Sequence, residues 1–325
     1  MLTIAIPTYN RADFLDLCLT RVGEELVRLG EDQRGLVKVY VSNNASTDNT
    51  REVIARHQLK LAGEFDVVHN VENIGGERNV AQCYTAATTP YVWVLGDDDV
   101  ILIDGLQKVM AVLFPQDVDI LYVGNYWFQD DYGQRPGRRE NHGTLKYSDS
   151  VAYARKTGVM LTFISGLIVK SSIKTTYYDG ILRGGNLPQL GWVLPLLRDG
   201  KKFAVIEDWV LAAKGSNSGG YGLVKVFGTN LVRITDEILK EMPDVARAIQ
   251  NGAIVDFFPG FVLELRKGNS QFSDKDMAAG LKEAFGDNWR YCVFLVPLLW
   301  LPLFVASYYH MLIKIFRRFF HSVLV

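Results

Sequence analysis

Three consecutive aspartates, Asp97, Asp98 and Asp99, are separated by Gly96 alone from the apolar run TTPYVWVL, which is typical of a buried strand. Adjacent carboxylates repel one another, so the cluster calls for a positive charge. Carboxylates separated by one residue suit Mg²⁺ or Mn²⁺, which keeps waters and takes phosphate oxygens as its other ligands. A metal held in this way neutralises a diphosphate leaving group. The alternative is a cap for a helix beginning near Ile103, but one aspartate suffices for a cap.

Polar loops also follow three other apolar runs. They are PTYNR (7–11), SNNASTDNT (42–50) and NVENIGGERN (70–79). The glycine pair in the last loop lets the backbone approach a ligand, and Arg11 and Arg78 can reach a phosphate. Turns and a helix cap would equally explain the glycines and Ser46-Thr47-Asp48. They do not explain Asn43 and Asn44, which therefore favour a binding site.

The elements that must position these loops alternate regularly along the first half. Short β-rich runs are expected at 3–6, 37–42, 65–69, 91–95 and 118–123, with helices at 12–29, 48–61, 77–85 and 103–113. This alternation predicts a mainly parallel α/β sheet with helices on both faces. Such sheets place their sites at the carboxyl ends of the strands, where all four polar loops fall.

The rest of the chain has less regular patterns. We expect a loop at 127–142, mixed α/β structure at 161–210, a flexible stretch at 215–221 and helices from there to about Trp289.

Composition narrows the function classes. The chain has 325 residues, 48% of them hydrophobic, and a net charge of −1, so no overall basicity indicates nucleic acid. The three cysteines, Cys18, Cys83 and Cys292, are widely spaced, which argues against disulfides or zinc and favours a reducing cytoplasm. The apolar start is too short for a signal peptide, so we interpret it as the first strand.

The C-terminal part differs sharply, because residues 292–313 contain no Asp, Glu, Lys or Arg. The run is long enough to be a transmembrane candidate. However, Pro297 and Pro302 would kink a continuous helix, and a single span would place the following cations outside, against the positive-inside tendency. We therefore favour a monotopic or re-entrant anchor.

Five basic residues follow at helical spacing and are predicted to share one face: His310, Lys314, Arg317, Arg318 and His321. Aromatic and aliphatic residues fill most of the remainder, as in a helix that lies in the plane of a membrane surface. Lys314, Arg317 and Arg318 are the expected membrane contacts. The alternative is a core helix of the soluble domain.

In their order and spacing, IPTYNR, VSNNASTDNT, NIGGERN and VLGDDD resemble the family-2 glycosyltransferases with the Rossmann-like GT-A fold, and most closely the abequosyltransferase-like branch. The resemblance is strong over residues 1–125 and looser over 160–215. It implies transfer of a sugar from a nucleotide-sugar donor with Mn²⁺ or Mg²⁺. The implied donor-binding residues are Pro7, Thr8, Tyr9, Arg11, Asn43, Asn44, Gly75, Arg78, Asp97 and Asp98. Asp97 and Asp99 are the implied metal ligands, with Asp99 the principal one, and Asp98, Asp99 and Gln189 the implied catalytic positions.

At two places the sequence differs from the family pattern, and each difference suggests a hypothesis. Asn43 stands where the family usually has Asp, and an amide matches the N3 acceptor and N4 amine of cytosine, which favours a CDP-sugar. Pro188-Gln189 stands where inverting members have Glu-Asp, and glutamine cannot act as a base. Either another acid takes the role, or the reaction retains the anomeric configuration, which we favour. The candidate acids are Asp130, Asp131, Asp179 and Asp199.

The sequence thus predicts a GT-A domain at 1–215, a helical acceptor-side region at 216–290 and membrane-associating helices at 291–325. The expected function is transfer of a sugar, such as abequose from a CDP-sugar, to a polyprenyl-diphosphate-linked saccharide of a bacterial surface polysaccharide (O-antigen). The expected location is the cytoplasmic face of the inner membrane. The alternatives are an inverting UDP- or dTDP-sugar transferase of the same fold, and a catalytically silent membrane scaffold or glycan-binding protein.

Overall fold

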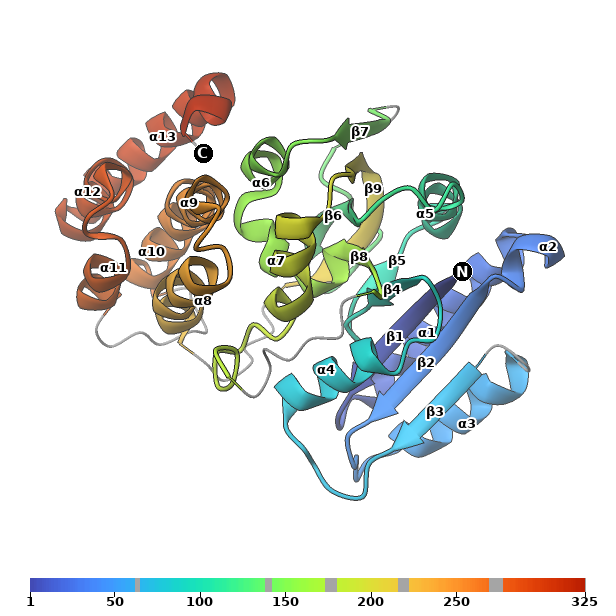
Figure 1. The fold of residues 1–325 in the computed structure, drawn as a ribbon. Helices are drawn as coiled ribbons and strands as arrows, with labels where there is room; N and C mark the ends of the chain where they lie inside the picture. The colour runs from blue at the N-terminus through green and yellow to red at the C-terminus, as the bar shows by residue number, and fades with distance from the viewer. Residues whose placement is uncertain (62–64, 138–141, 173–179, 216–221, 269–276, 325) are drawn as a thin grey trace. The chain divides into compact units, whose positions relative to one another are not determined.

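The computed structural model describes residues 1–61, 65–137, 142–172, 180–215, 222–268 and 277–324. The chain forms two compact units (Figure 1). Unit 1 comprises Met1–Ser148, Phe163–Tyr178 and Gly191–Gly215, and unit 2 comprises Asp149–Thr162, Asp179–Leu190 and Ser216–Val325. Two segments of the predicted first region therefore belong to unit 2, and the functional division into three regions stays a prediction.

Unit 1 is built on one sheet, and the strands described in it run in the order β3-β2-β1-β4-β8-β6-β9-β5, with β7 beside β9. Their bounds are β1 Leu2–Thr8, β2 Val37–Asn43, β3 Phe65–His69, β4 Tyr91–Val94, β5 Val100–Ile101, β6 Ile120–Phe128, β7 Thr144–Tyr147, β8 Leu167–Lys170 and β9 Phe203–Lys214. Strands β1 to β4 are parallel, whereas β8 is antiparallel to both its neighbours.

The helices of unit 1 cover both faces of this sheet (Figure 1). They are α1 Ala12–Arg28, α2 Glu31–Arg34, α3 Thr50–Lys60, α4 Gly76–Thr85, α5 Gly105–Leu113 and α7 Leu190–Asp199. Alternate strand residues, such as Ile4, Val39 and Trp93, pack against α1, α3 and α5 in one buried core. Burial on both faces explains why these strands are almost continuously apolar.

The strands and helices predicted in the first half are confirmed, within one or two residues at most ends. The predicted loop at 127–142 was wrong at its start, because Trp127 and Phe128 continue β6 against β9. The predicted flexible stretch at 215–221 lies outside the described residues except for Gly215, which follows β9.

Unit 2 is helical in the residues described (Figure 1). Its α-helices are α6 Ser150–Thr157, α8 Leu231–Ile238, α9 Pro243–Gly252, α10 Phe258–Arg266, α11 Met277–Phe285, α12 Val296–Trp300 and α13 Leu303–Leu324. Leu301, just before Pro302, has extended backbone and separates α12 from α13. Among the described residues, no helix has the length and apolar character needed to span a bilayer.

Candidate functional site

The four polar loops of the sequence lie together at one edge of the sheet, because β1 to β4 are adjacent and parallel. Backbone hydrogen bonds join neighbouring loops: the N–H of Asn44 donates to the carbonyl of Thr8, and the N–H of Asn70 donates to that of Asn43, both at 2.9 Å. The predicted convergence of these loops is thus confirmed.

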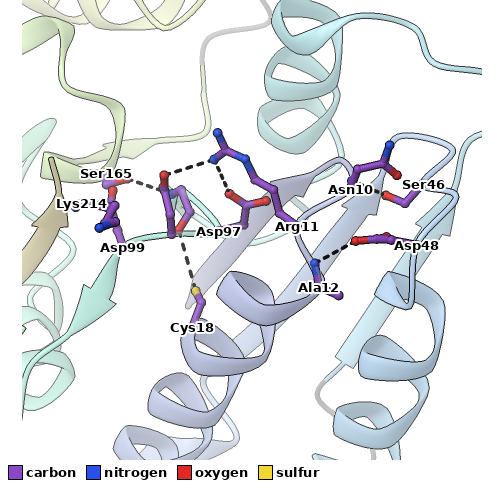
Figure 2. Close-up of polar contacts among 12 residues, drawn as sticks. Asn10, Arg11, Ala12, Cys18, Ser46, Asp48, Asp97, Asp99, Ser165 and Lys214 are labelled. Carbon is purple, nitrogen blue, oxygen red and sulfur yellow. Dashed lines mark hydrogen bonds and ion pairs between the residues drawn. The ribbon is translucent and has the colours of Figure 1, made fainter. Parts of the chain in front are cut away.

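Arg11 lies between two of the aspartates (Figure 2). Its Nη1 donates to Oδ1 of Asp97 and to Oδ2 of Asp98, each at 3.1 Å. Arg11 precedes α1, and the aspartates follow β4, so the contact joins the first and fourth loops. The positive charge that the cluster requires is therefore supplied in part by the chain itself.

Asp99 is bound differently from its neighbours. It is buried, and its Oδ1 accepts from the backbone N–H of Lys214 at 2.8 Å. Ser165 lies beside it, and the hydroxyl of Ser165 accepts from the N–H of Gly96 at 2.8 Å. Burial and the charge of Asp98 together raise the pKa of Asp99 to about 8. Asp99 is thus fixed to the second half of the sheet, through β9.

Burial and the neighbouring carboxylates disfavour ionisation of two of the aspartates. Burial raises the pKa of Asp97 to about 6, even though Arg11 lowers it. Beneath the loop, the Cys18 thiol donates to the carbonyl of Gly96 (3.8 Å), and its pKa is held well above the ordinary value by burial and by the three aspartates. Buried carboxylates that lie close together favour a bound cation.

The second loop is held by the two asparagines that the sequence assigned to ligand binding. Asn43 Oδ1 accepts from the N–H of Ser46, and its amide nitrogen lies 3.0 Å from Nδ1 of His69. Asn44 Oδ1 accepts from the N–H of Ile74 at 2.9 Å, which ties the second loop to the third. Both side chains are buried. They have structural partners, and their contact with a nucleotide stays a prediction.

Asp48 and Asn10 fasten the first loop to the second (Figure 2). Asp48 Oδ2 accepts from the N–H of Ala12 at 3.1 Å, and its Oδ1 accepts from the N–H of Thr50. Asn10 adopts a positive φ of 51°, and its N–H donates to the hydroxyl of Ser46. These bonds hold the starts of α1 and α3 together and fix the direction of the loop that carries Arg11.

The predicted donor residues of the first and third loops are arranged around this edge. Thr8 is buried at the end of β1, next to Pro7, whereas Tyr9 is an exposed aromatic residue. Gly75 has a φ of 86°, which favours glycine, and leads into α4. Arg78 is exposed in the first turn of that helix. Exposed aromatic, cationic and glycine groups thus remain available at the loop tips.

The donor set fits a hard divalent cation. In the described part of the chain, no three His, Cys, Asp or Glu side chains form a ready ligand group. However, carboxylate oxygens of Asp97 and Asp98 already converge on one guanidinium nitrogen. Mg²⁺ or Mn²⁺ takes few protein carboxylates and completes its shell with water and phosphate. The convergent pair is Asp97 with Asp98, while the expected role of Asp99 as a ligand stays a prediction.

Gln189 is buried in unit 2, where its amide donates to the carbonyl of Thr162 at 2.5 Å. Of the alternative acids, Asp199 is paired with Arg198, which lowers its pKa and makes it a weak base. Asp130 and Asp131 are exposed after β6. Asp179 lies outside the described residues. The catalytic assignment of Gln189 therefore stays a prediction.

Two groups that contact Asp99 or its loop are absent from the predicted site residues: the side chain of Ser165 and the backbone of Lys214. Ser165 stands in the unremarkable stretch FISGLIV, and a backbone N–H leaves no trace in residue type. Only the pairing of β8 with β4 and of β9 with β5 reveals these contacts.

A mainly parallel α/β sheet with helices on both faces and aspartates at the strand ends is the GT-A architecture. The chain belongs to glycosyl transferase family 2, whose sequence profile matches residues 3–173. The resemblance seen in the sequence is thereby confirmed.

Two curated relatives are similar to part of the chain. Abequosyltransferase RfbV of Salmonella typhimurium is 29% identical over 118 residues, which are 36% of this chain and 33% of that protein. The uncharacterized glycosyltransferase MG025 of Mycoplasma genitalium is 28% identical over 120 residues, 37% of this chain and 38% of that protein. The match spans less than two fifths of either relative's length.

Solved structures share the fold over nearly the whole chain. S. aureus TarS 1-349 in complex with UDP-GlcNAc has a TM-score of 0.61 at 15% identity, covering 98% of this chain and 91% of that one. The mannosyltransferase PcManGT from Pyrobaculum calidifontis, in complex with GDP-Man and Mn²⁺, has a TM-score of 0.53 at 16% identity, covering 97% and 86%.

Proposed function

We propose that this family-2 glycosyltransferase transfers a sugar from a nucleotide-sugar donor with the help of a divalent cation. The observation that carries the proposal is the convergence of Asp97 and Asp98 on Arg11, at the edge where the four strand-end loops meet. Complexes of two fold neighbours with UDP-GlcNAc and with GDP-Man and Mn²⁺ support the same class of donor and cofactor.

Each group at the edge has a role in this proposal. Asp97, Asp98 and Asp99 would hold the cation, which neutralises charge on the departing diphosphate. Arg11, already 3.1 Å from two carboxylates, is placed to exchange these contacts for a phosphate oxygen. The exposed ring of Tyr9 offers a flat surface to the nucleobase. The exposed Arg78 supplies a second cation at the third loop.

The identity of the donor is a separate question. The similarity to an abequosyltransferase supports a deoxyhexose as the transferred sugar, and we propose a CDP-sugar as the first donor to test. The amide of Asn43 bonds to His69 and Ser46 within the protein. An amide has two N–H donors and two acceptor sites on its oxygen, so the expected contact of Asn43 with cytosine stays a prediction.

We further propose a lipid-linked saccharide as the acceptor and retention of the anomeric configuration. Gln189 cannot accept a proton from an acceptor hydroxyl, and Asp199 is tied to Arg198. In a retaining front-face reaction, the leaving phosphate oxygen takes the proton of the acceptor hydroxyl, so no protein base is required. NMR of the product's anomeric centre reads out the configuration directly, and an inverted product refutes retention.

The central experiment measures binding of CDP, UDP, GDP and dTDP by calorimetry, with and without Mn²⁺. We expect one nucleotide to bind at least tenfold more tightly when Mn²⁺ is present. Asp98→Asn removes a charge from the cluster and is expected to abolish this enhancement, since a neutral amide is a poorer ligand for a hard cation. Hydrolysis of the matching nucleotide sugar should fall in parallel.

The matched control is Asp66→Asn, which removes an exposed carboxylate from β3 in the same unit. Asp66→Asn is expected to leave nucleotide binding and its Mn²⁺ dependence unchanged. Absence of binding for all four nucleotides by the folded wild-type protein would refute the proposed function and would favour the scaffold alternative.

A further inference from the structure

Helix α13 has one face packed on the protein and another directed to solvent. The packed face contains Ala306, His310 and Ile313, all buried and spaced by four and three residues. Arg317 continues this face, where it forms an ion pair with Asp256 of the η4 segment Ala253–Phe257. The packed face is therefore complete without a further partner.

The opposite face of α13 is an exposed stripe of large apolar residues. Its members are Phe304, Tyr308, Met311, Leu312, Ile315 and Phe319. Their spacing of four, three, one, three and four residues places them on one side of a helix. Phe304 is 70% exposed and Phe319 is 74% exposed, so the stripe is open over its length. Single exposed apolar residues are ordinary, but a continuous stripe indicates an interaction surface.

Exposed apolar residues extend the stripe beyond α13. Trp300, at the end of α12, is 73% exposed, and Leu303 follows it at the start of α13. Val293 is also exposed, and its carbonyl accepts from the hydroxyl of Tyr309 at 2.8 Å, which places its backbone beside α13. The surface is therefore broader than a single helix face and includes a tryptophan, a residue enriched where membrane meets water.

Cations lie along one edge of the stripe. Lys314 and Arg318 are exposed, and helical geometry places both on the same flank of the line from Phe304 to Phe319. Residues 288–325 contain no Asp or Glu. The predicted face of five basic residues was wrong in part, because His310 and Arg317 belong to the packed side, and the side chain of His321 lies outside the described residues. The charge of Arg317 therefore stabilises the fold, whereas those of Lys314 and Arg318 are available to a partner.

We propose that the exposed stripe, with Trp300, Lys314 and Arg318, docks on an anionic lipid bilayer with α13 lying in the membrane plane. An in-plane helix needs apolar groups in the acyl boundary and cations against the headgroups, while its other face remains on the protein. Ala306 and Ile313 are buried on the packed face, so that face of α13 remains on the protein. The charge pattern favours an anionic surface, because no carboxylate of this segment opposes it.

Docking on a membrane also fits a lipid-linked acceptor. The docking proposal does not depend on that acceptor, because it concerns the surface of unit 2 alone. Its test therefore uses no sugar transfer. Sedimentation with vesicles of phosphatidylcholine and phosphatidylglycerol should carry the full-length protein into the pellet, whereas pure phosphatidylcholine should bind far less. Brominated lipid should quench tryptophan fluorescence, and Trp300→Phe should remove most of that quenching.

Two double variants separate the contribution of the cations to vesicle binding from that of the apolar stripe. Lys314→Gln with Arg318→Gln is expected to weaken binding to anionic vesicles about 30-fold, from roughly fivefold for each cation. Phe304→Ser with Phe319→Ser should abolish binding to both kinds of vesicle. The matched controls are Lys240→Gln with Lys282→Gln, two exposed lysines of unit 2, and Phe114→Ser, an exposed phenylalanine of unit 1. The controls should bind like the wild type.

Circular dichroism establishes that each variant is folded before binding is compared. Equal binding by the wild-type protein and both stripe variants would overturn the proposal, as would a wild-type protein that ignores anionic vesicles. If Phe304→Ser with Phe319→Ser instead converts a stable dimer to a monomer in sedimentation equilibrium, the stripe covers a second copy of the chain and the membrane proposal is wrong.

Discussion

Gly96 determines how closely the three aspartates can gather. A Cβ atom at this position would lie 3.0 Å from Oδ2 of Asp99, 3.1 Å from Oδ1 of Asp98 and 3.2 Å from the hydroxyl of Ser165. Any side chain at this position would therefore crowd Asp98, Asp99 and Ser165.

Replacing Gly96 by Ala should therefore disturb the cluster more than the fold. We expect a loss of about 1–2 kcal/mol in the free energy of unfolding, because the carboxylates must move to accept the methyl group. The Mn²⁺-dependent affinity for nucleotide should fall at least tenfold. Urea denaturation and calorimetry measure the two effects.

Gly35→Ala serves as the control, since a Cβ there meets no atom within 4 Å and the residue lies after α2. It should leave both quantities nearly unchanged. An unaltered nucleotide affinity in Gly96→Ala would show that the carboxylates do not need their close spacing.

Residue type alone did not reveal the structural partners of the two asparagines, Asn43 and Asn44. The motif SNNASTDNT correctly marked a strand-end loop, because its turn-forming residues stop β2 at Asn43. It could not show that Asn43 pairs with His69 or that Asn44 holds Ile74, since these partners lie 26 and 30 residues away in the chain. A buried asparagine that binds a loop and one that binds a ligand have the same appearance in a sequence.

At the scale of the elements, the site depends on helices that begin where strands end. Asp48 accepts from Ala12 at the start of α1 and from Thr50 at the start of α3, so one carboxylate holds two helix N-termini. These hydrogen bonds and the positive ends of both helices favour the ionised carboxylate, and the pKa of Asp48 is lowered. Its position is set by the parallel pairing of β1 with β2.

Asp48→Ala should therefore reduce both stability and binding. Losing these hydrogen bonds to the N–H groups of Ala12 and Thr50 is expected to cost about 1–2 kcal/mol in the free energy of unfolding. Because Asp48 also anchors the loop that carries Arg11, nucleotide affinity should fall severalfold. Chemical denaturation and calorimetry provide the two measurements.

Unit 2 offers a matched control in Asp149, whose carboxylate accepts from Ala152 and caps α6. Asp149→Ala should lose a similar amount of stability, while nucleotide affinity stays at the wild-type level. If both variants weaken binding equally, loss of stability alone explains the effect and the anchoring role of Asp48 is refuted.

Elements were easier to predict where local pattern and tertiary environment agree. Strands β1, β2 and β4 are apolar, short and bounded by turns, so their existence followed from the sequence. Helix α13 was less predictable, since its cations repeat at helical spacing on both the packed and the open side. Only Asp256, which lies about 60 residues earlier in the chain, shows that Arg317 faces inward.

At the scale of the whole molecule, the sequence predicted the parallel half of the sheet but not the mixed half. Strand β8 lies antiparallel between β4 and β6, and β9 brings its backbone to Asp99. These long-range pairings bury the aspartates, whose desolvation no local pattern expresses. When these buried carboxyls are ionised, they therefore lower the free energy of unfolding.

The burial of Asp97 and Asp99 predicts how the free energy of unfolding depends on pH. Burial raises the pKa of Asp97 to about 6 and that of Asp99 to about 8, both above the ordinary value of a carboxyl. A raised pKa in the folded state means that folding favours the protonated form. The free energy of unfolding of the metal-free protein should therefore fall as pH rises from about 4 to 8, on the order of 3 kcal/mol from Asp97 alone.

Thermal unfolding in EDTA across this range measures the effect, which should appear as a midpoint that decreases with pH. Asp99→Asn removes one buried charge and should flatten the upper part of the curve, between about pH 6 and 8, where Asp99 titrates and Asp97 is already ionised. Asp66→Asn, on the exposed edge strand, should leave the slope unchanged. A midpoint that rises over the same range in all three proteins would mean that the cluster is stabilised as carboxylates by its surroundings, and Arg11 would then suffice as its counter-ion.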